Sequence, residues 1–196
     1  MSTGDRIPLA EAARDADAFR ALFAGAYERW VVAGSVRRRA PDVGDIEHVV
    51  QTQRGEVRTA GEMFPREAPL VHHQLDAMLA AGTIAKALYG ATQATRWGDR
   101  LRGVVWRGRR HEIFFGDDRN FYAQLVIRTG PAGFSEALVT RMRAIGLYSQ
   151  GGDTEATRGY VASQRDGSIR TVTSEEDYFG LCGTPYIPPE GRRNPA

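Results

Sequence analysis

The sequence is poor in cysteine and lysine, and it has no long apolar run. Cys182 is the one cysteine among 196 residues, which excludes an internal disulfide and a zinc site built from cysteines. No stretch approaches the roughly 20 apolar residues of a transmembrane helix, and the N-terminus lacks the apolar core of a signal peptide. We therefore expect a cytoplasmic protein, or an intracellular viral or phage protein, with no membrane partner.

Because Lys86 is the single lysine, arginine carries nearly all of the positive charge, although the net charge is only +2. The arginines gather in three short clusters: Arg37 to Arg39, then Arg107, Arg109 and Arg110, then Arg141 and Arg143. Forked guanidinium groups suit phosphate oxygens. Local basic clusters without an extreme net charge are compatible with a nucleic-acid or nucleotide partner.

Length and composition predict one domain or two small subdomains. Of the 196 residues, 42% are apolar and 26% charged, values that support a core and a hydrated surface. Helical and strand-like periodicities alternate without a repeat, which predicts an α+β fold with a mixed sheet. The expected strands are 30–33, 45–51, 102–106 and 110–115, with a hairpin of 160–163 and 169–172. The expected helices are one after Pro8 that carries Phe19 to Tyr27, then 70–81, one through 125–128, 134–145, and a short one ending at Leu181.

Two of these helices have predicted caps. Asp117 and Asp118 offer an N-cap for the helix through 125–128. The segment 173–176 resembles a capping box for the short helix that ends at Leu181.

Gly34-Ser35-Val36-Arg37-Arg38-Arg39 follows an apolar strand and has the composition of a phosphate-binding turn. A glycine lets the backbone turn and approach a ligand, and oriented N–H groups attract an anion. The arginines supply positive charge and forked donors. The structural alternative is an ordinary turn followed by a solvated basic patch.

Asp45, Glu47 and Glu112 are the candidate acids. Residues two apart on a strand share a face, so Asp45 and Glu47 project together while Ile46 points into the core. Glu112 lies in a second strand that can pair beside the first. Three carboxylates near a phosphate site predict magnesium, and two ions can hold the attacking and leaving oxygens of phosphoryl transfer. The alternatives are that the pair is an exposed strand face and that Glu112 pairs with a neighbouring arginine, such as Arg110. His48 and His111 fall on the opposite face, so we expect them to be packed.

Gly34-Ser35-Val36-Arg37-Arg38 followed by Gly44-Asp45-Ile46-Glu47 resembles the signature of the DNA polymerase beta-like nucleotidyltransferases, the family X DNA polymerases. Further segments resemble the same family: Arg6-Ile7-Pro8, Arg109 to Ile113, Thr129-Gly130 with Phe134, and Gly183 to Glu190. The last segment is the most specific, because a Gly-Ser motif alone occurs in many nucleotidyltransferases. The similarity extends over nearly the whole chain.

The resemblance implies a palm subdomain over 1–118 and a C-terminal thumb subdomain over 119–196, without lyase or fingers subdomains. It implies a metal-dependent DNA nucleotidyltransferase that uses dNTP to extend a DNA 3′-hydroxyl and releases pyrophosphate. We expect template-directed filling of short gaps. The implied cofactor is two Mg²⁺ ions, with Mn²⁺ as a substitute, and the implied partners are dNTP and gapped or primer-template DNA. We expect a monomer.

The resemblance also implies roles for individual residues. Asp45 and Glu47 would bind both metals, and Glu112 the catalytic one. The triphosphate would contact Gly34, Ser35, Arg38 and Gly44, with help from Arg6. The sugar and base pocket would contain Thr129, Gly130, Phe134 and Ser135, and DNA would contact Arg141 and Arg143.

Several positions depart from the family pattern. Glu47 and Glu112 stand where the family usually has aspartate, and Ile127-Arg128 replaces an aromatic pair that helps to exclude ribose. Two alternatives therefore stay open. One is the same chemistry on another acceptor, by untemplated or ribonucleotide addition. The other is a nucleotide- or DNA-binding protein that has lost catalysis.

Overall fold

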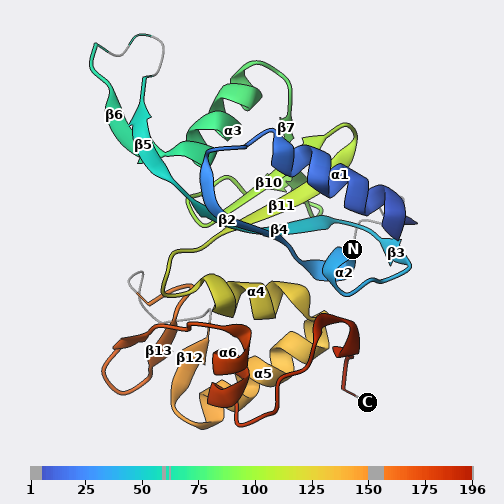
Figure 1. The fold of residues 1–196 in the computed structure, drawn as a ribbon, viewed down its shortest axis with the longest axis vertical. Helices are drawn as coiled ribbons and strands as arrows, with labels where there is room; N and C mark the ends of the chain where they lie inside the picture. The colour runs from blue at the N-terminus through green and yellow to red at the C-terminus, as the bar shows by residue number, and fades with distance from the viewer. Residues whose placement is uncertain (1–5, 59–60, 62, 150–156, 196) are drawn as a thin grey trace.

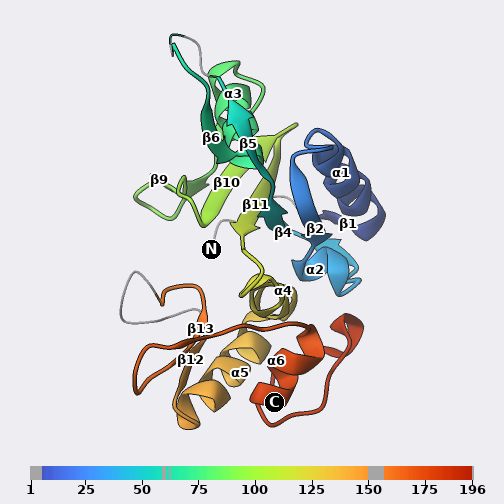
Figure 2. The same ribbon diagram turned by 60° about the vertical axis from the view of Figure 1, so that its left-hand side comes forward.

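A computed structural model describes residues 6–58, 61, 63–149 and 157–195. The chain forms two parts that lie one above the other in Figures 1 and 2. The N-terminal part is built on a mixed sheet with helices on one face, and the C-terminal part is mainly helical. The predicted mixed α+β class is confirmed, whereas the palm and thumb assignment stays a prediction.

The central sheet has five strands in the order β2 (Tyr27–Val32), β4 (Ile46–Thr52), β11 (Arg109–Phe115), β10 (Leu101–Trp106) and β7 (Ala85–Lys86). β4 and β11 run parallel, and the other neighbours are antiparallel. The central β4 and β11 are rich in β-branched and aromatic residues, which suit a pleated and buried surface.

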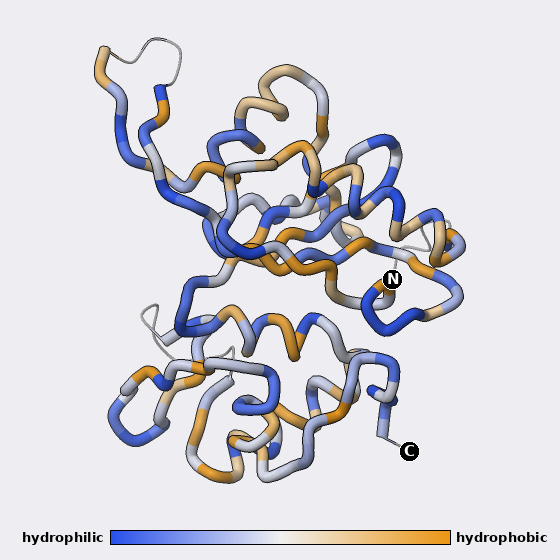
Figure 3. The backbone as a smooth tube through the Cα atoms, in the orientation of Figure 1, coloured by the Kyte–Doolittle hydropathy of each residue, from blue (hydrophilic) through white to orange (hydrophobic). Residues whose placement is uncertain are grey.

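The two faces of the sheet have different partners because strand side chains alternate. Helices α1 (Leu9–Ala21) and α3 (Leu70–Ala80) cover one face. There Phe19 and Leu75 pack against Trp30, Val50 and Ile113. Figure 3 shows apolar segments concentrated in the central strands, whereas the turn around α2 (Gly34–Arg37) is strongly hydrophilic.

The opposite face of the sheet contacts α4 (Phe121–Thr129). Val49 and Phe114, from β4 and β11, pack against Phe121 and Leu125 of this helix. This contact brings the C-terminal part against the face of the sheet that also carries Glu47 and Glu112.

The C-terminal part has its own core. It contains α5 (Ala132–Ala144), α6 (Glu175–Leu181), the short η1 (Pro189–Gly191) and a sheet of β12 (Leu147–Ser149), β13 (Val161–Ser163) and β14 (Ile169–Arg170). Phe134, Leu138, Tyr178 and Phe179 are among its buried residues. The predicted cap of the last helix is confirmed, because Ser174 Oγ accepts the backbone N–H of Asp177 at 3.0 Å.

Three antiparallel pairs of short strands lie outside these two sheets. β1 (Ile7–Pro8) pairs with β3 (Asp42–Val43), and β5 (Arg54–Val57) pairs with β6 (Arg66–Pro69). β8 (Leu88–Tyr89) pairs with β9 (Ala94–Thr95). No helix in the described ranges has both the length and the apolar character needed to cross a bilayer.

Some predicted boundaries are wrong. The first helix ends at Ala21, since Gly25 adopts a positive φ of 81° and Tyr27 already begins β2. The N-cap of α4 is Asn120, because Asp117 instead accepts hydrogen bonds from Arg119. Helix α5 begins at Ala132, directly after Pro131, two residues before the predicted start.

Candidate functional site

Glu47 and Glu112 stand opposite each other on the parallel strands β4 and β11. Neighbouring strands lie about 4.8 Å apart, so the two side chains leave the same sheet face from adjacent positions. Glu112 is buried, with 9% of its surface exposed. The prediction that the strand of Glu112 pairs beside the strand of Glu47 is confirmed.

The electrostatics of this acid pair are unfavourable for two negative charges. Burial first, and then the neighbouring charge of Glu112, raise the pKa of Glu47 to about 7, against lowering by Arg128 and Arg38. Removing water disfavours a carboxylate, and a like charge adds to that cost. A cation beside both carboxylates would relieve both effects.

Gly34 begins α2 and lies directly against Glu47. Its φ is +58°, in the left-handed region that favours glycine. A Cβ added at this position would overlap Oε2 of Glu47. The position therefore requires glycine for its backbone conformation and for the close approach of the turn to the acid.

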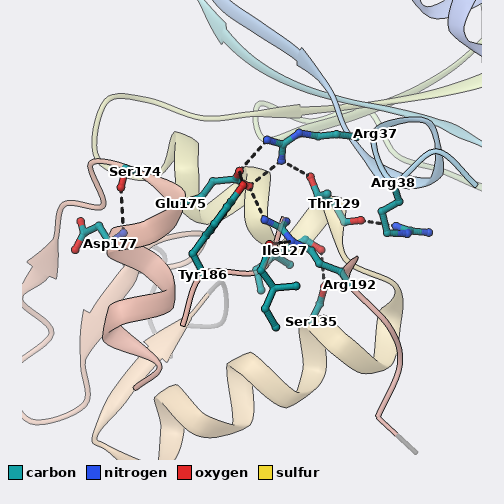
Figure 4. Close-up of polar contacts among 11 residues, drawn as sticks. Arg37, Arg38, Ile127, Thr129, Ser135, Ser174, Glu175, Asp177, Tyr186 and Arg192 are labelled. Carbon is teal, nitrogen blue, oxygen red and sulfur yellow. Dashed lines mark hydrogen bonds and ion pairs between the residues drawn. The ribbon is translucent and has the colours of Figure 1, made fainter. Parts of the chain in front are cut away.

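Arg38 and Ser35 are close together, as the motif predicts for a phosphate site. Arg38 Nη2 donates to Ser35 Oγ at 3.3 Å, and Arg38 Nη1 donates to the Thr129 carbonyl oxygen (Figure 4). Burial lowers the pKa of Arg38; the charge of Glu47 raises it, and that of Arg192 lowers it. Arg38 thus lies between the acid pair and the C-terminal tail.

Arg37 has a different role from the one that its place in the basic cluster indicates. It donates to Glu175 Oε1 and Oε2 at 2.7 and 2.8 Å and to Thr129 Oγ1 at 2.9 Å (Figure 4). Glu175 is buried and also accepts from Arg192 at 3.1 Å. Burial acts to raise the pKa of Glu175, but the hydrogen bonds and charges of these two arginines lower it overall.

Arginines also contact the other acids. Arg96 Nη1 lies 3.2 Å from Glu112 Oε1, and Arg110 Nη1 lies 3.4 Å from Asp45 Oδ2. The alternative that Glu112 pairs with an arginine is therefore confirmed, although its partner is Arg96 and not Arg110. Asp45 is half-exposed and lies just before β4.

Tyr89 lies between two of these arginines. The guanidinium carbons of Arg96 and Arg110 are 4.1 and 5.1 Å from the centre of its ring. Its hydroxyl oxygen packs on Gly103, and burial followed by the charge of Glu112 raises its pKa. Sequence reasoning missed Tyr89 and Arg96, because residues 85–97 carry no motif.

Glu47 and Glu112 fit a divalent cation by their chemistry, since both offer hard oxygen ligands from one buried sheet face. Within the described ranges, however, no group of three His, Cys, Asp or Glu side chains is close enough to hold a metal. The inclusion of Asp45 in a three-acid site, and the number of ions, therefore stay predictions.

The four residues predicted for the sugar and base pocket divide into two pairs. Thr129 and Gly130 end α4 beside Arg37 and Arg38. Phe134 and Ser135 are buried in the C-terminal core instead, where Ser135 Oγ donates to the Ile127 carbonyl oxygen at 2.8 Å. A Cβ at Gly130 would meet Phe134 and Ser135 at 2.7 and 2.8 Å, so this turn is tightly packed.

The remaining predicted residues lie in three different segments. Arg6 is exposed and donates to the Asp42 carbonyl oxygen at 2.7 Å, in the segment that follows α2. Gly44 lies in the connection between β3 and β4. Arg141 and Arg143 are exposed in the last turn of α5.

The two histidines next to the acids are packed, as predicted. His48 and His111 are fully buried, with His48 Nε2 3.0 Å from His111 Nδ1. Trp30 Nε1 donates to His48 Nδ1 at 3.0 Å, so neutral His48 carries its proton on Nε2 and donates it to His111. Burial lowers the pKa of His111 to about 3, which keeps this layer neutral.

No protein-family model matches the chain. The functional assignment therefore depends on the motif residues and on the geometry described above.

Proposed function

We propose that the protein is a metal-dependent DNA nucleotidyltransferase. It adds nucleotides from dNTP to a DNA 3′-hydroxyl, releases pyrophosphate, and acts by template-directed filling of short gaps. The observation that carries this proposal is the position of the Gly34-Ser35 turn and Arg38 directly beside the opposed carboxylates of Glu47 and Glu112.

Each group of residues contributes a separate part of the reaction. Ser35 and Arg38 hold the terminal phosphates of the nucleotide, with Arg6 and the backbone at Gly34 and Gly44 near them. Glu112, which the resemblance places beside the 3′-hydroxyl, would help to accept the proton of that hydroxyl.

Glu47 and Glu112 would hold Mg²⁺, or Mn²⁺ in its place, with Asp45 as the predicted third ligand. When bound, the metal supplies positive charge that stabilises the charge developing on the transferred phosphoryl group. In this proposal Arg141 and Arg143 contact the DNA backbone from α5, and the protein works as a monomer.

The test is primer extension by the full chain on a one-nucleotide gap, an open template-primer and a single strand. Each substrate is incubated with dNTPs or NTPs, in Mg²⁺ or Mn²⁺. We expect templated dNTP addition on the gap, and a loss of at least about 100-fold in Glu112→Gln. Glu56→Gln, which changes an exposed glutamate on β5, is the matched control and should retain full activity.

Other outcomes point to the alternatives. Addition to the single strand, or equal use of NTPs, would show that another acceptor or sugar is used. Arg128 motivates this reading, because Ile127-Arg128 replaces the aromatic pair that helps the family to exclude ribose. The guanidinium carbon of Arg128 lies 4.0 Å from the centre of the Phe114 ring, and its positive charge interacts with Glu47 and Glu112.

A catalytically silent nucleotide- or DNA-binding protein is the second candidate. It is favoured by the ion pairs Arg96–Glu112 and Arg110–Asp45, which supply positive charge to the acids from within the protein. Nucleotide binding without addition on any substrate would support this candidate and overturn the polymerase proposal.

A further inference from the structure

A cavity of about 390 Å³ lies between the segment after α2 and the C-terminal tail. Its wall contains four arginines, Arg38, Arg39, Arg192 and Arg193, and one acid, Glu190. We call this cavity the arginine pocket. Arg38 and Arg39 come from the phosphate-site motif, whereas Arg192 and Arg193 belong to the C-terminal tail.

Arg192 is a buried charge held in a fixed position. Only 2% of its surface is exposed. Its Nε donates to the Ile187 carbonyl oxygen at 3.0 Å, and its Nη2 donates to Glu175 at 3.1 Å. In the part of the chain that the structure describes, its buried Nη1 has no hydrogen-bond partner. A buried donor without a partner is costly, and Arg192 itself lines the arginine pocket.

The pocket has a strong excess of positive charge. Glu190 lies 3.4 Å from Arg39, in an exposed contact that neutralises one of the four arginines. Burial lowers the pKa of Arg38, and the positive charge of Arg192 lowers it as well. Arg39 also has a φ of +56°, a backbone conformation that non-glycine residues rarely adopt and that is typical of functional positions.

We propose that the arginine pocket binds a free condensed phosphate, with pyrophosphate as the simplest example. Several convergent guanidinium forks match an anion with many oxygens and several charges. The pocket adjoins the acid pair through Arg38, which interacts electrostatically with both Glu47 and Arg192. The binding of free pyrophosphate depends on this geometry alone and does not require the proposed function.

The experiment is calorimetric titration of the full chain with pyrophosphate in EDTA, so that no divalent metal contributes. Tripolyphosphate, dNTP, orthophosphate and a 5′-phosphorylated oligonucleotide are titrated in parallel. We expect Arg39→Gln and Arg193→Gln each to weaken pyrophosphate binding about fivefold to tenfold, and Arg193→Lys to recover part of the loss. Arg165→Gln changes an exposed arginine in the β13–β14 turn and is the matched control.

Pyrophosphate that binds both glutamine variants as tightly as the wild type would overturn the inference. An equal loss in Arg165→Gln would also overturn it, because surface charge alone would then explain the binding. Tighter binding of the 5′-phosphorylated oligonucleotide than of pyrophosphate, lost in Arg193→Gln, would assign the pocket to DNA ends instead.

The inference and the proposed function can fail separately. Pyrophosphate binding that depends on Arg193, in a protein without transfer activity, would support the pocket and reject the polymerase. The opposite result is nucleotide transfer that needs Glu112, together with unchanged pyrophosphate binding in Arg39→Gln and Arg193→Gln. It would support the polymerase and reject the pocket. Glu112→Gln itself should bind pyrophosphate normally, because Glu112 does not line the pocket.

Discussion

Arg37 and Glu175 form a bidentate ion pair with N–O distances of 2.7 and 2.8 Å, although they are 138 positions apart in the sequence. Arg37 belongs to the turn that lies against Glu47, and Glu175 begins α6 in the C-terminal part. The pair therefore fixes the position of the candidate phosphate turn relative to the C-terminal core. Since Arg192 shares the same carboxylate, one acid holds two cations in place.

Glu175→Gln should lower the free energy of unfolding by about 3 kcal/mol, because it leaves two partly or fully buried guanidinium groups without their counter-charge. Urea denaturation followed by tryptophan fluorescence measures the change. Glu176→Gln alters an exposed neighbour in the same helix and should stay within about 0.5 kcal/mol of the wild type. Equal effects of the two substitutions would contradict the role of Glu175.

Gly34→Ala should destabilise the protein more than Gly25→Ala does. Both glycines have positive φ, at 58° and 81°, so each alanine incurs a conformational penalty of about 1 kcal/mol. A Cβ at Gly34 also overlaps Glu47, whereas a Cβ at Gly25 meets nothing within 4 Å. Thermal unfolding of the two variants isolates the cost of the contact with Glu47. Identical melting temperatures would show that the turn moves freely away from the acid.

Glu47 should make the protein less stable as pH rises. Its pKa is raised from 4.5 to about 7 in the folded state, so the folded protein binds more protons than the unfolded chain in this window. The stability linked to this group is fully present below pH 4.5 and is lost as pH rises through about 7, a loss of about 3 kcal/mol. Urea denaturation in EDTA at pH 5, 6, 7 and 8 measures it.

The matched variant for this pH dependence is Glu47→Gln, which keeps the shape of the side chain but does not titrate. We expect its stability to fall less than that of the wild type between pH 5 and 8, and to exceed it at pH 8. If the stability of the two proteins depends on pH in the same way, the raised pKa of Glu47 does not contribute to the pH dependence.

Arg96→Gln should increase the affinity for Mn²⁺ about threefold to tenfold. Arg96 lies 3.2 Å from Glu112 with half of its side chain exposed, so it competes with a cation for this carboxylate at a partly screened site. Calorimetric titration with Mn²⁺ measures the affinity directly. Arg54→Gln breaks an exposed ion pair with Glu67 and is the control. Weaker Mn²⁺ binding in Arg96→Gln would mean that Arg96 positions Glu112 instead of competing for it.

The sequence by itself determined which side chains share a face. Acidic and apolar residues alternate in 45–47, Glu112 is one acid in a largely apolar strand, and the period of two along a strand is a local property of the backbone. The packing of His48 and His111 on the face opposite to the neighbouring acids followed from it. The cap at Ser174 is equally local, because its hydroxyl reaches a backbone N–H three residues away.

Only the tertiary structure decided which residues from distant segments meet. The parallel register that places Glu47 opposite Glu112, and the exchange that gives Arg96 to Glu112 and Arg110 to Asp45, depend on how the strands and the β8–β9 hairpin pack. The Arg37–Glu175–Arg192 cluster and the arginine pocket join residues whose separation leaves no periodic trace in the sequence. Periodicity reports the local geometry of one element, whereas the partner of a charged side chain is fixed by the packing of all elements around it.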